Sequence, residues 1–356
     1  MLPEPLALAI DRATASVPQR VLRRAAATLS ERYRSESRRA LDPEEHLAYA
    51  ATRLPATYAA VVRVLGVARE VLPDLAPGSL LDLGAGPGTV LWAATDTLGP
   101  FSEATLVERD RGFAALGREL LAAGRFRTAV TWSARDLTER PALAPHDLVV
   151  AAFSVGETAA TGVDDAIAAA WEATRHALVV IEPGTAAGFA TILRVRAGLV
   201  ALGARLVAPC PHDARCPVSP PDVCHFAARL ARTRLHRQAK GVTRGFEDEK
   251  FSYIVAAKAG APAAARVVRR PEVRKGHLRL RLCTTDGLIH RTVSRREGDS
   301  YRAARRLRWG DAWSEPRGGG RSSRPSDQTA DETEADQDQG RPASGPAARE
   351  PGDATG

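Results

Sequence analysis

The sequence predicts an α/β fold in which a doubly wound, mainly parallel β-sheet has a helical layer before it and a small β-rich extension after it. Three observations lead to this prediction. Apolar, strand-like segments alternate with helical segments between residues 76 and 261, and a glycine-rich turn follows the first of these strands. Residues 262–313 then change to alternating, arginine-dense segments. A chain of 356 residues is long enough to bury a large core under such a sheet.

Residues 1–75 are expected to form a helical N-terminal region, because apolar residues recur there at three- and four-residue steps among Arg and Glu. The sheet region, residues 76–261, opens with a turn and the apolar strand SLLDL. Further strands with helical stretches between them are expected at ATLVERD, AVTWSARDL, HDLVVAAFS and ALVVIEPGT. A short strand RLVAPC and a last strand FSYIVAAKAG complete the sheet, with a cysteine-containing insertion at residues 209–245 between them.

The C-terminal segments differ in composition from the sheet region. Residues 262–313 are rich in arginine, and a Thr-Asp-Gly turn between two alternating segments predicts a β-hairpin. Residues 314–356 contain almost no apolar side chains. Burial cannot offset the conformational entropy of ordering such a segment, so we expect a disordered tail.

Composition narrows the class of protein. The net charge of +8 favours a polyanionic partner. No apolar run is long enough to cross a bilayer, and Glu4 and Asp11 stand where a secretory signal would have a basic start and an apolar core. We therefore expect a cytoplasmic protein with no membrane partner that is a monomer when free. Four cysteines are too few for a disulfide framework in a chain this long, and in a reducing compartment a cysteine cluster more often indicates metal binding or catalysis.

A glycine-rich loop follows the first strand. That strand ends at Asp82, and Gly84, Gly86 and Gly88 follow at alternate positions. Glycines suit a sharp loop whose backbone approaches a ligand at a helix N-terminus. The dinucleotide pattern G-x-G-x-x-G is not matched, because Thr89 stands where the third glycine would be. The spacing D-x-G-x-G-x-G instead resembles the first motif of class I S-adenosylmethionine (SAM)-dependent methyltransferases, in which an acid and loop amides hold the amino-acid end of the cofactor.

Two acidic residues further along the chain are candidates for the same cofactor site. Glu108 lies about twenty residues after the loop, where an acidic side chain would bind both ribose hydroxyls. Asp136 falls where that superfamily places a residue near the adenine amino group. No catalytic residue can be named. The segment AAFSVGE lacks the Asn/Asp-Pro-Pro-aromatic sequence by which amino-group methylases hold a base, and it has no cysteine nucleophile.

The cysteines form a second candidate site. Cys210, Cys216 and Cys224 lie close together in the sequence, and Cys283 is distant. None of them forms the C-x-x-C knuckle usual for structural zinc, whereas longer, proline-containing loops suit a bulkier centre, and four cysteines complete one [4Fe–4S] cluster. Zinc and free buried thiols are the alternatives. Two histidines could substitute for a cysteine as ligands, namely His212 and His225.

Several segments between about residues 30 and 311 together resemble one family, the methyltransferase-like assembly factors of the small ribosomal subunit found in bacteria and in mitochondria. These segments are LAYAATRLPATYAAV, LLDLGAGPGT, VVIEPGT, the CP…CP…CHF run, FEDEKFSYIVAAK and the late LC…DG with SYRAARRLRWGD. The resemblance implies that the four cysteines hold an iron–sulfur cluster and that Gly84, Gly86 and Gly88 form the cofactor loop. It also implies that the protein associates with small-subunit ribosomal RNA or its precursor particle.

The arginine-dense extension fits such a partner, because phosphate contacts supply affinity that does not depend on sequence. Tyr301 and Trp309 would be available for stacking on bases. Arg266 and Arg302 belong to the same dense run. The expected RNA-binding residues are Arg269, Arg270, Arg274, Lys275, Arg279, Arg281, Arg295, Arg296, Arg305 and Arg306.

The sequence therefore favours a SAM-binding, iron–sulfur-containing methyltransferase that acts on small-subunit ribosomal RNA during ribosome assembly or translation. Two alternatives stay open. A non-catalytic assembly factor that retains the SAM pocket is favoured by the missing substrate motif, whereas the intact glycine loop with Glu108 favours an active enzyme. The other alternative is a zinc-stapled small-molecule methyltransferase, in which the arginines are only solvent-exposed surface residues.

Overall fold

The computed structural model describes residues 1–35, 40–124, 126–136, 143–158 and 162–315. These residues lie within one compact unit, Met1–Pro316. The tail expected to be disordered lies outside the described residues from residue 316 onward. Within the described ranges, no helix has both the length and the apolar composition needed to cross a membrane.

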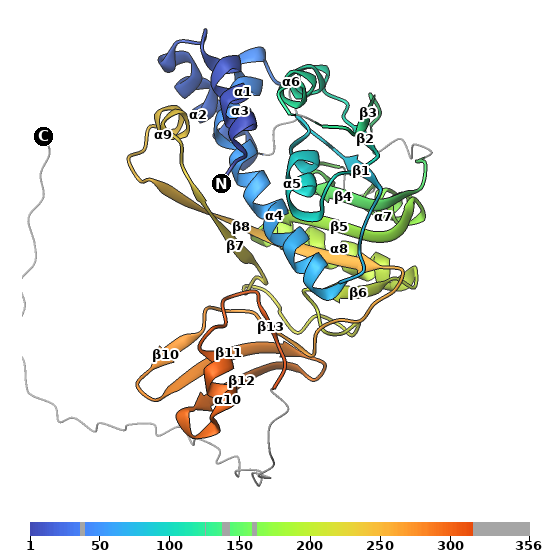
Figure 1. Cartoon of the computed structure of the whole chain (residues 1–356), viewed down its shortest axis with the longest axis vertical. Helices are drawn as coiled ribbons and strands as arrows, with labels where there is room; N and C mark the ends of the chain where they lie inside the picture. The colour runs from blue at the N-terminus through green and yellow to red at the C-terminus, as the bar shows by residue number, and fades with distance from the viewer. Residues whose placement is uncertain (36–39, 125, 137–142, 159–161, 316–356) are drawn as a thin grey trace, which may run out of the picture. The chain divides into compact units, whose positions relative to one another are not determined.

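The central sheet has the strand order β3-β2-β1-β4-β5-β8-β6, with β7 paired to the outer part of β8 (Figure 1). Neighbouring strands from β3 to β5 are parallel, whereas β8 runs antiparallel to β5, β6 and β7. This arrangement confirms the predicted Rossmann-like fold of the class I methyltransferases. The strands are β1 (Ser79–Leu83), β2 (Glu103–Val107), β3 (Ala129–Ser133), β4 (His146–Ala152), β5 (Thr174–Pro183), β6 (Arg205–Ala208), β7 (Phe226–Ala231) and β8 (Phe246–Ala257).

Helices cover both faces of the sheet, because alternate strand residues point to opposite sides. Leu80, Val150 and Ile181 pack into a core with five helices, whereas Leu81 and Val180 pack into a second core with two others. The first five are α1 (Glu4–Thr14), α3 (Pro43–Thr52), α4 (Leu54–Val71), α5 (Thr89–Leu98) and α6 (Arg111–Ala122), and the other two are α7 (Val163–Glu172) and α8 (Ala186–Ala201).

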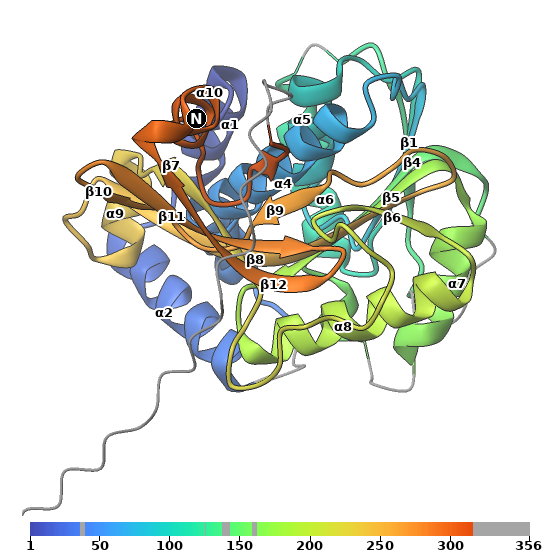
Figure 2. The ribbon, with the colours of Figure 1, turned by 90° about the horizontal axis from the view of Figure 1, so that it is seen from below.

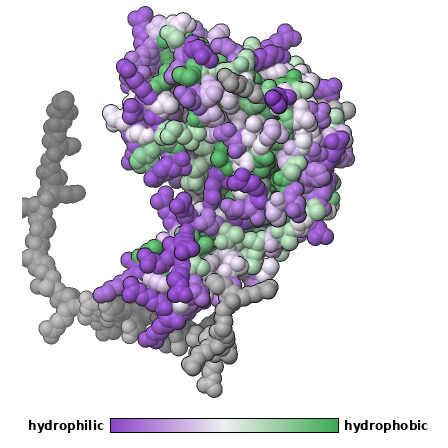
Figure 3. Space-filling model, viewed as in Figure 1, coloured by the Kyte–Doolittle hydropathy of each residue, from purple (hydrophilic) through white to green (hydrophobic). Residues whose placement is uncertain are grey.

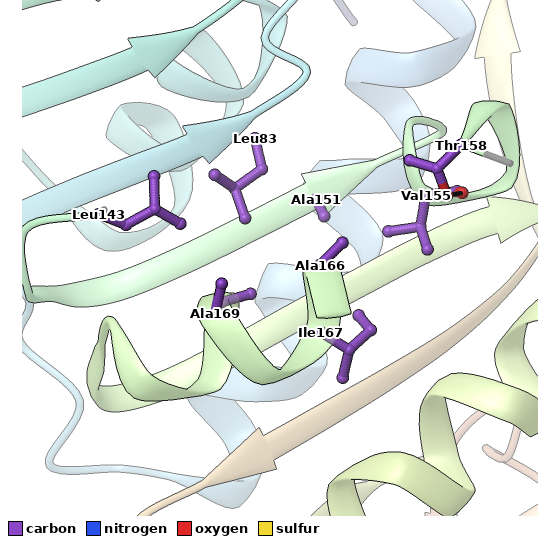
Figure 4. Close-up of a pocket in the computed structure, with 9 residues that line it drawn as sticks. Leu83, Leu143, Ala151, Val155, Thr158, Ala166, Ile167 and Ala169 are labelled. Carbon is purple, nitrogen blue, oxygen red and sulfur yellow. Dashed lines mark hydrogen bonds between the residues drawn. The ribbon is translucent and has the colours of Figure 1, made fainter. Parts of the chain in front are cut away.

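The second core is tightly packed beneath α7. Figure 4 shows an apolar pocket between β4 and α7, lined by residues such as Leu83, Ala151 and Ile167. Its volume is only about 10 Å³, roughly the space needed for one water molecule. This pocket is a packing gap and offers no room for a ligand.

The insertion between β6 and β8 contains more structure than the sequence predicted. Residues 209–225 connect β6 to β7 and carry three of the four cysteines, and we call this segment the cysteine loop. After it, β7 and β8 form a long antiparallel hairpin whose connection includes α9 (Arg234–Lys240). Ala239 of α9 is buried against α2 (Gln19–Ser35) and α3 (Pro43–Thr52), so the hairpin reaches back to the N-terminal helices (Figure 1). The alanine-rich sequence of β7 has a weak intrinsic strand preference, and its pairing with β8 is what makes it a strand.

The C-terminal segment forms a separate sheet, which we call the C-terminal platform, residues 265–313. Its central strand β11 (His277–Thr284) pairs with its neighbours in a five-stranded arrangement. Leu278, Leu280 and Leu282 point into a small core of its own. The other elements are β9 (Ala265–Val267), β10 (Glu272–Arg274), β12 (Gly287–Ser294), β13 (Ala312–Trp313) and helix α10 (Asp299–Ala304).

Candidate functional site

The glycine loop lies at the carboxyl end of β1, beside the point where the strand order reverses between β1 and β4. Open α/β sheets bind ligands at such a switch point. Gly84, Gly86 and Gly88 all have positive φ angles, of 75°, 52° and 77°, which explains the need for glycine. A Cβ on Gly84 would lie 2.3 Å from Ser154 Cβ, whereas a Cβ on Gly86 would meet nothing within 4 Å. Gly84 is therefore required for packing, and Gly86 borders open space.

Two of the predicted acids lie next to this loop. Asp82 is fully buried, and neither of its carboxylate oxygens has a hydrogen-bond partner among the residues that the structure describes. Burial and the nearby charge of Glu108 raise the pKa of Asp82 well above its usual range. Glu108 accepts hydrogen bonds from the backbone amides of Gly86 and Asp110, each at 2.7 Å. The structure thus brings Asp82 and Glu108 together on the loop.

Asp136 lies further out at the same edge of the sheet. Its carboxylate pairs with Arg109 at 2.9 Å. The charge of Arg109 also opposes the pKa rise in Glu108 and in Glu157, which shows that Arg109 lies near these acids too. Asp136 is therefore connected to the loop region through Arg109.

The sequence reasoning missed two further carboxylates at this site. Glu182 is the penultimate residue of β5 and accepts a hydrogen bond from Gly156 N at 3.1 Å, and burial raises its pKa to about 8. Glu157 lies in a short 3₁₀ helix, η2 (Val155–Glu157), after β4, and burial followed by the charge of Glu108 raises its pKa. Each follows a strand or lies at the end of one, so the rule that parallel strands gather functional groups at their carboxyl ends could have found them.

The N-terminal helices form one wall of this region. His46 on α3 lies 2.8 Å from Asp110 Oδ1, and Tyr49 packs edge-on against Phe113 with ring centroids 4.8 Å apart. Burial raises the pKa of Tyr49 to about 12, with smaller contributions from the charges of Glu157 and Glu108. Helix α3 therefore reaches the acidic end of the sheet.

The structure brings Cys283 next to the loop that carries the other three cysteines, although it lies far from them in sequence. Burial raises the pKa of the Cys224 thiol, and the charges of Cys210, Cys216 and Cys283 add to this effect. Burial likewise raises the pKa of Cys283 to about 12, and the charges of Cys210 and Cys216 contribute. The charge of each of these cysteines thus acts on at least one of the others, and we call the four together the thiol group.

The two candidate histidines differ in position. His212 Nε2 lies 3.7 Å from Cys283 Sγ, next to the thiols. His225 instead packs edge-on against Trp309, with ring centroids 5.0 Å apart. Among the described residues, no group of three or more His, Cys, Asp or Glu side chains is close enough to hold a metal ion directly. The cysteine loop runs alongside α8 (Figure 2) and borders an open hollow of about 780 Å³ that reaches Cys216.

Two buried arginines flank the thiols. Arg196 on α8 donates to the carbonyl oxygens of His212, at 2.8 Å, and Ala214. Arg266 on β9 lies opposite Cys283 in the pairing of β9 with β11, and its Nη1 donates to Gly310 O at 3.1 Å. Arg266 is 1% exposed, so it is not available for the RNA contacts expected of this arginine run.

The other predicted RNA-binding residues divide into two sets. Arg269 and Arg281 both pair with Asp222 in the cysteine loop. Tyr301 is buried, so its ring is not presented for stacking as expected, whereas Trp309 is partly buried and packs against His225 and Phe226. Hydrophilic residues gather over the C-terminal platform in Figure 3. The exposed predicted residues are Arg270, Arg274, Lys275, Arg279, Arg295, Arg296, Arg305 and Arg306.

The strand order, together with the glycine loop and its acids at the switch point, defines a protein of the class I methyltransferase fold. Within that class, the chain belongs to the family described as mitochondrial small ribosomal subunit Rsm22, whose model matches residues 43–314. This family membership confirms the resemblance found in the sequence.

Two curated relatives illustrate the similarity. The human protein named "Ribosome assembly protein METTL17, mitochondrial" is 31% identical over 295 residues, which cover 74% of this chain and 61% of that protein. "Rsm22-cox11 tandem protein 2, mitochondrial" of Schizosaccharomyces pombe is 26% identical over 337 residues, which cover 80% of this chain and 45% of that protein. The chain thus spans about half to three-fifths of the length of these relatives.

Solved methyltransferase structures also resemble part of the chain. Magnesium protoporphyrin IX methyltransferase from Synechocystis, with bound SAH, has a TM-score of 0.39 and 12% identity, covering 65% of this chain and 94% of that structure. The N-methyltransferase NodS from Bradyrhizobium japonicum has a TM-score of 0.35 and 15% identity, covering 55% of this chain and 85% of that structure. These scores are low, and the fold assignment depends on the strand order.

Proposed function

We propose that this protein binds SAM and an iron–sulfur cluster and acts on small-subunit ribosomal RNA during ribosome assembly. The observation that carries this proposal is the position of Cys283. Cys283 lies on β11 of the arginine-bearing C-terminal platform, and its Sγ is 3.7 Å from His212 Nε2 in the cysteine loop of the methyltransferase fold. A centre shared by the two parts would hold the exposed arginines in a fixed relation to the SAM site.

The strand-end site suits SAM in charge and shape. Gly86 borders open space, which lets a ligand approach the loop backbone. The unpartnered carboxylate of Asp82 and the neighbouring Glu108 favour a ligand that carries positive charge and hydroxyl donors. In this proposal Glu108 holds the ribose hydroxyls and Asp136 lies near the adenine. SAM would supply an electrophilic methyl group at this site.

The thiol group suits a polynuclear centre. Four thiols from two distant parts of the chain are neighbours, and cysteine thiolates are the usual ligands of [4Fe–4S] clusters. We assign the ligands as Cys210, Cys216, Cys224 and Cys283, with His212 as the nearest other donor. A zinc ion is the alternative occupant. The centre's role is structural, because metal-site free energy is also folding free energy.

Ribosome assembly is proposed from the family and from the surface of the C-terminal platform. The description of the matched family names the mitochondrial small ribosomal subunit, and the human relative is named a ribosome assembly protein. The exposed arginines of the platform supply the phosphate-binding charge that an RNA partner requires. The cytoplasmic location expected from the sequence stays a prediction, since these relatives are named as mitochondrial.

Whether methyl transfer occurs distinguishes two forms of this proposal. We assign no catalytic base, because the acidic residues at this site are already proposed to bind SAM. A non-catalytic assembly factor that retains the SAM pocket is the second candidate, favoured by the absence of a substrate-holding motif after β4. A zinc-stapled small-molecule methyltransferase is the third.

The test uses anaerobically purified protein, immature small subunits and SAM with a labelled methyl group. SAM binding is measured by calorimetry, particle binding by co-sedimentation, and transfer by label in the RNA. Gly86→Arg should abolish SAM binding because its side chain enters the open space above the loop. Gly203→Arg is the matched control, since Gly203 also has a positive φ and a Cβ placed on it would meet nothing within 4 Å.

Label in the RNA that is lost only in Gly86→Arg would establish the active enzyme. Particle and SAM binding without label would establish the non-catalytic factor. Protein that binds neither immature particles nor SAM contradicts the proposal. Zinc in place of iron, with no particle binding, would identify the small-molecule methyltransferase.

A further inference from the structure

Two arginines beside the thiol group carry charge in the protein interior. Arg266 is 1% exposed and Arg196 is 6% exposed. In the part of the chain that the structure describes, neither forms an ion pair with an aspartate or glutamate. An unpaired buried charge is costly, so folding around two of them requires a nearby anion or a specific structural reason.

Hydrogen bonds satisfy each guanidinium only in part. Arg266 donates through Nε to Pro209 O at 3.3 Å and through Nη1 to Gly310 O at 3.1 Å, but its buried Nη2 has no partner within the described part of the chain. Arg196 donates through Nη2 to two loop carbonyls, but its Nε is buried without a partner. Each side chain therefore keeps at least one free N–H group in the interior.

Both arginines lie against the residues that carry the thiols. Arg266 is the direct cross-strand partner of Cys283 and bonds the carbonyl of Pro209, the residue before Cys210. Arg196 bonds the carbonyl of His212, whose ring lies 3.7 Å from Cys283 Sγ. Arg196 and Cys216 line the same hollow. The two guanidinium groups thus approach the thiol group from two separate elements, α8 and β9.

We propose that Arg196 and Arg266 are the buried counter-cations of the metal–thiolate centre held by the four cysteines. This inference rests on the proposed cluster. Four thiolates around a [4Fe–4S] core leave about two negative charges, and hydrogen bonds to the sulfurs set the stability and potential of such centres. The two arginines supply matching positive charge, and their unpartnered N–H groups are donors for sulfur. They are positioning residues that stabilise the centre without being its ligands.

A purely structural role is the competing explanation, in which each guanidinium only clamps loop carbonyls. The two roles differ in their dependence on charge. Lysine and methionine both lose the planar fork that bonds the carbonyls, but only lysine keeps the positive charge. If each arginine only holds the loop carbonyls, the Met and Lys substitutions should have the same effect. If it balances the charge of the centre, lysine should keep part of that stabilisation and methionine should lose it.

The experiment compares full-length, anaerobically purified protein carrying Met or Lys at position 196 or at position 266. Iron and sulfide per chain are followed during exposure to a chelator, and the midpoint reduction potential is measured by titration. Arg194→Met is the control, because Arg194 lies on the same helix and pairs with Asp164 at the surface.

Arg196→Met and Arg266→Met should lose the cluster about 10- to 100-fold faster than the wild type, as expected for residues that support metal ligands. Their potential should fall, since reduction adds negative charge that no cation offsets. Arg196→Lys and Arg266→Lys should recover most of the potential, and Arg194→Met should match the wild type. This inference would be overturned if the Met and Lys variants at a position had the same reduction potential, or if the Met variants lost the cluster no faster than the wild type. Either outcome would leave the proposed cluster itself standing. Wild-type protein that holds no iron would overturn the proposed cluster itself.

Discussion

Arg63 on α4 and Asp311 on the C-terminal platform are joined by an ion pair of 2.9 Å between Nη2 and Oδ1. The two residues are 248 positions apart in the sequence. Phe226 and Trp309 pack beside this pair, with ring centroids 6.4 Å apart. The platform is therefore attached to the methyltransferase fold by ordinary contacts as well as by the thiol group.

This double attachment predicts that the ion pair and the centre reinforce each other. Arg63→Met alone should cost no more than about 1 kcal/mol of unfolding free energy, because both partners are about one-third exposed. In Cys283→Ser protein the same change should cost more, since the ion pair then carries a larger share of the attachment. Thermal unfolding and hydrogen exchange over residues 265–313 measure both effects.

The control for this cycle is Arg194→Met, which removes a surface pair between α8 and Asp164 on α7. Its cost should be the same with and without Cys283. Strict additivity of Arg63→Met and Cys283→Ser would show that the centre does not help to hold the platform.

The exposed arginines of the C-terminal platform should determine the salt dependence of RNA binding. Arg279→Ala or Arg296→Ala should each lower the log–log slope of affinity against salt by roughly 0.7 to 0.9, the contribution of one phosphate contact. Arg269→Ala is the matched control, because Arg269 is held by Asp222. Filter binding to precursor small-subunit RNA over a salt series checks this.

An equal loss of slope in all three variants would show that Arg269 leaves Asp222 to bind phosphate. No loss in any variant would place the RNA surface elsewhere on the protein.

Glu182 should make the ligand-free protein less stable as pH rises. Its pKa is about 8 in the folded protein because of burial, against an ordinary value near 4.5. Between these two values the folded state holds a proton that the unfolded state has released, so stability decreases as pH increases. Glu182→Gln should remove this slope and stabilise the protein by about 1 to 4 kcal/mol at pH 8, with little change at pH 4.

Urea unfolding at several pH values measures the effect of Glu182→Gln. Glu119→Gln, at an exposed position of α6, is the control substitution. A parallel profile for wild type and Glu182→Gln would show that the Glu182 carboxylate is ionised in the folded protein throughout this range.

Glu247 should have the opposite pH dependence at the hairpin that carries α9. Arg232 and Lys240 each lie 2.7 Å from its carboxylate, and together with His236 they hold its pKa well below the ordinary value despite burial. The stabilisation is complete above about pH 4.5, the ordinary glutamate pKa, and decreases as pH falls toward the lowered value. Glu247→Gln should therefore cost about 1 to 3 kcal/mol at pH 7 and much less near pH 3.

The neighbouring Asp248 provides the comparison for this prediction. It pairs with Arg229 at the surface, so Asp248→Asn should cost about 0.5 kcal/mol or less. Equal costs for the two substitutions at pH 7 would show that the Glu247 group of ion pairs contributes no more than a surface pair.

The sequence by itself determined the central sheet, the loop and the identity of the thiol residues. Strand-like segments such as ALVVI in β5 are continuous apolar runs because both faces of a parallel sheet are buried, and this local pattern is readable without a structure. The glycines after Asp82 are required by local φ angles, and the cysteines are chemically distinctive. Properties fixed by a residue and its near neighbours could be predicted.

Only the tertiary structure decided which distant residues meet. Strand β7 exists because β8 pairs with it, and Glu157 and Glu182 join the loop acids because parallel strands end at one edge. The arginine run looked uniform in sequence, yet folding buried Arg266 beside Cys283 and left Arg279 exposed. Burial and charge pairing depend on contacts between parts far apart in the chain, so no local pattern could distinguish a buried guanidinium from one that faces solvent.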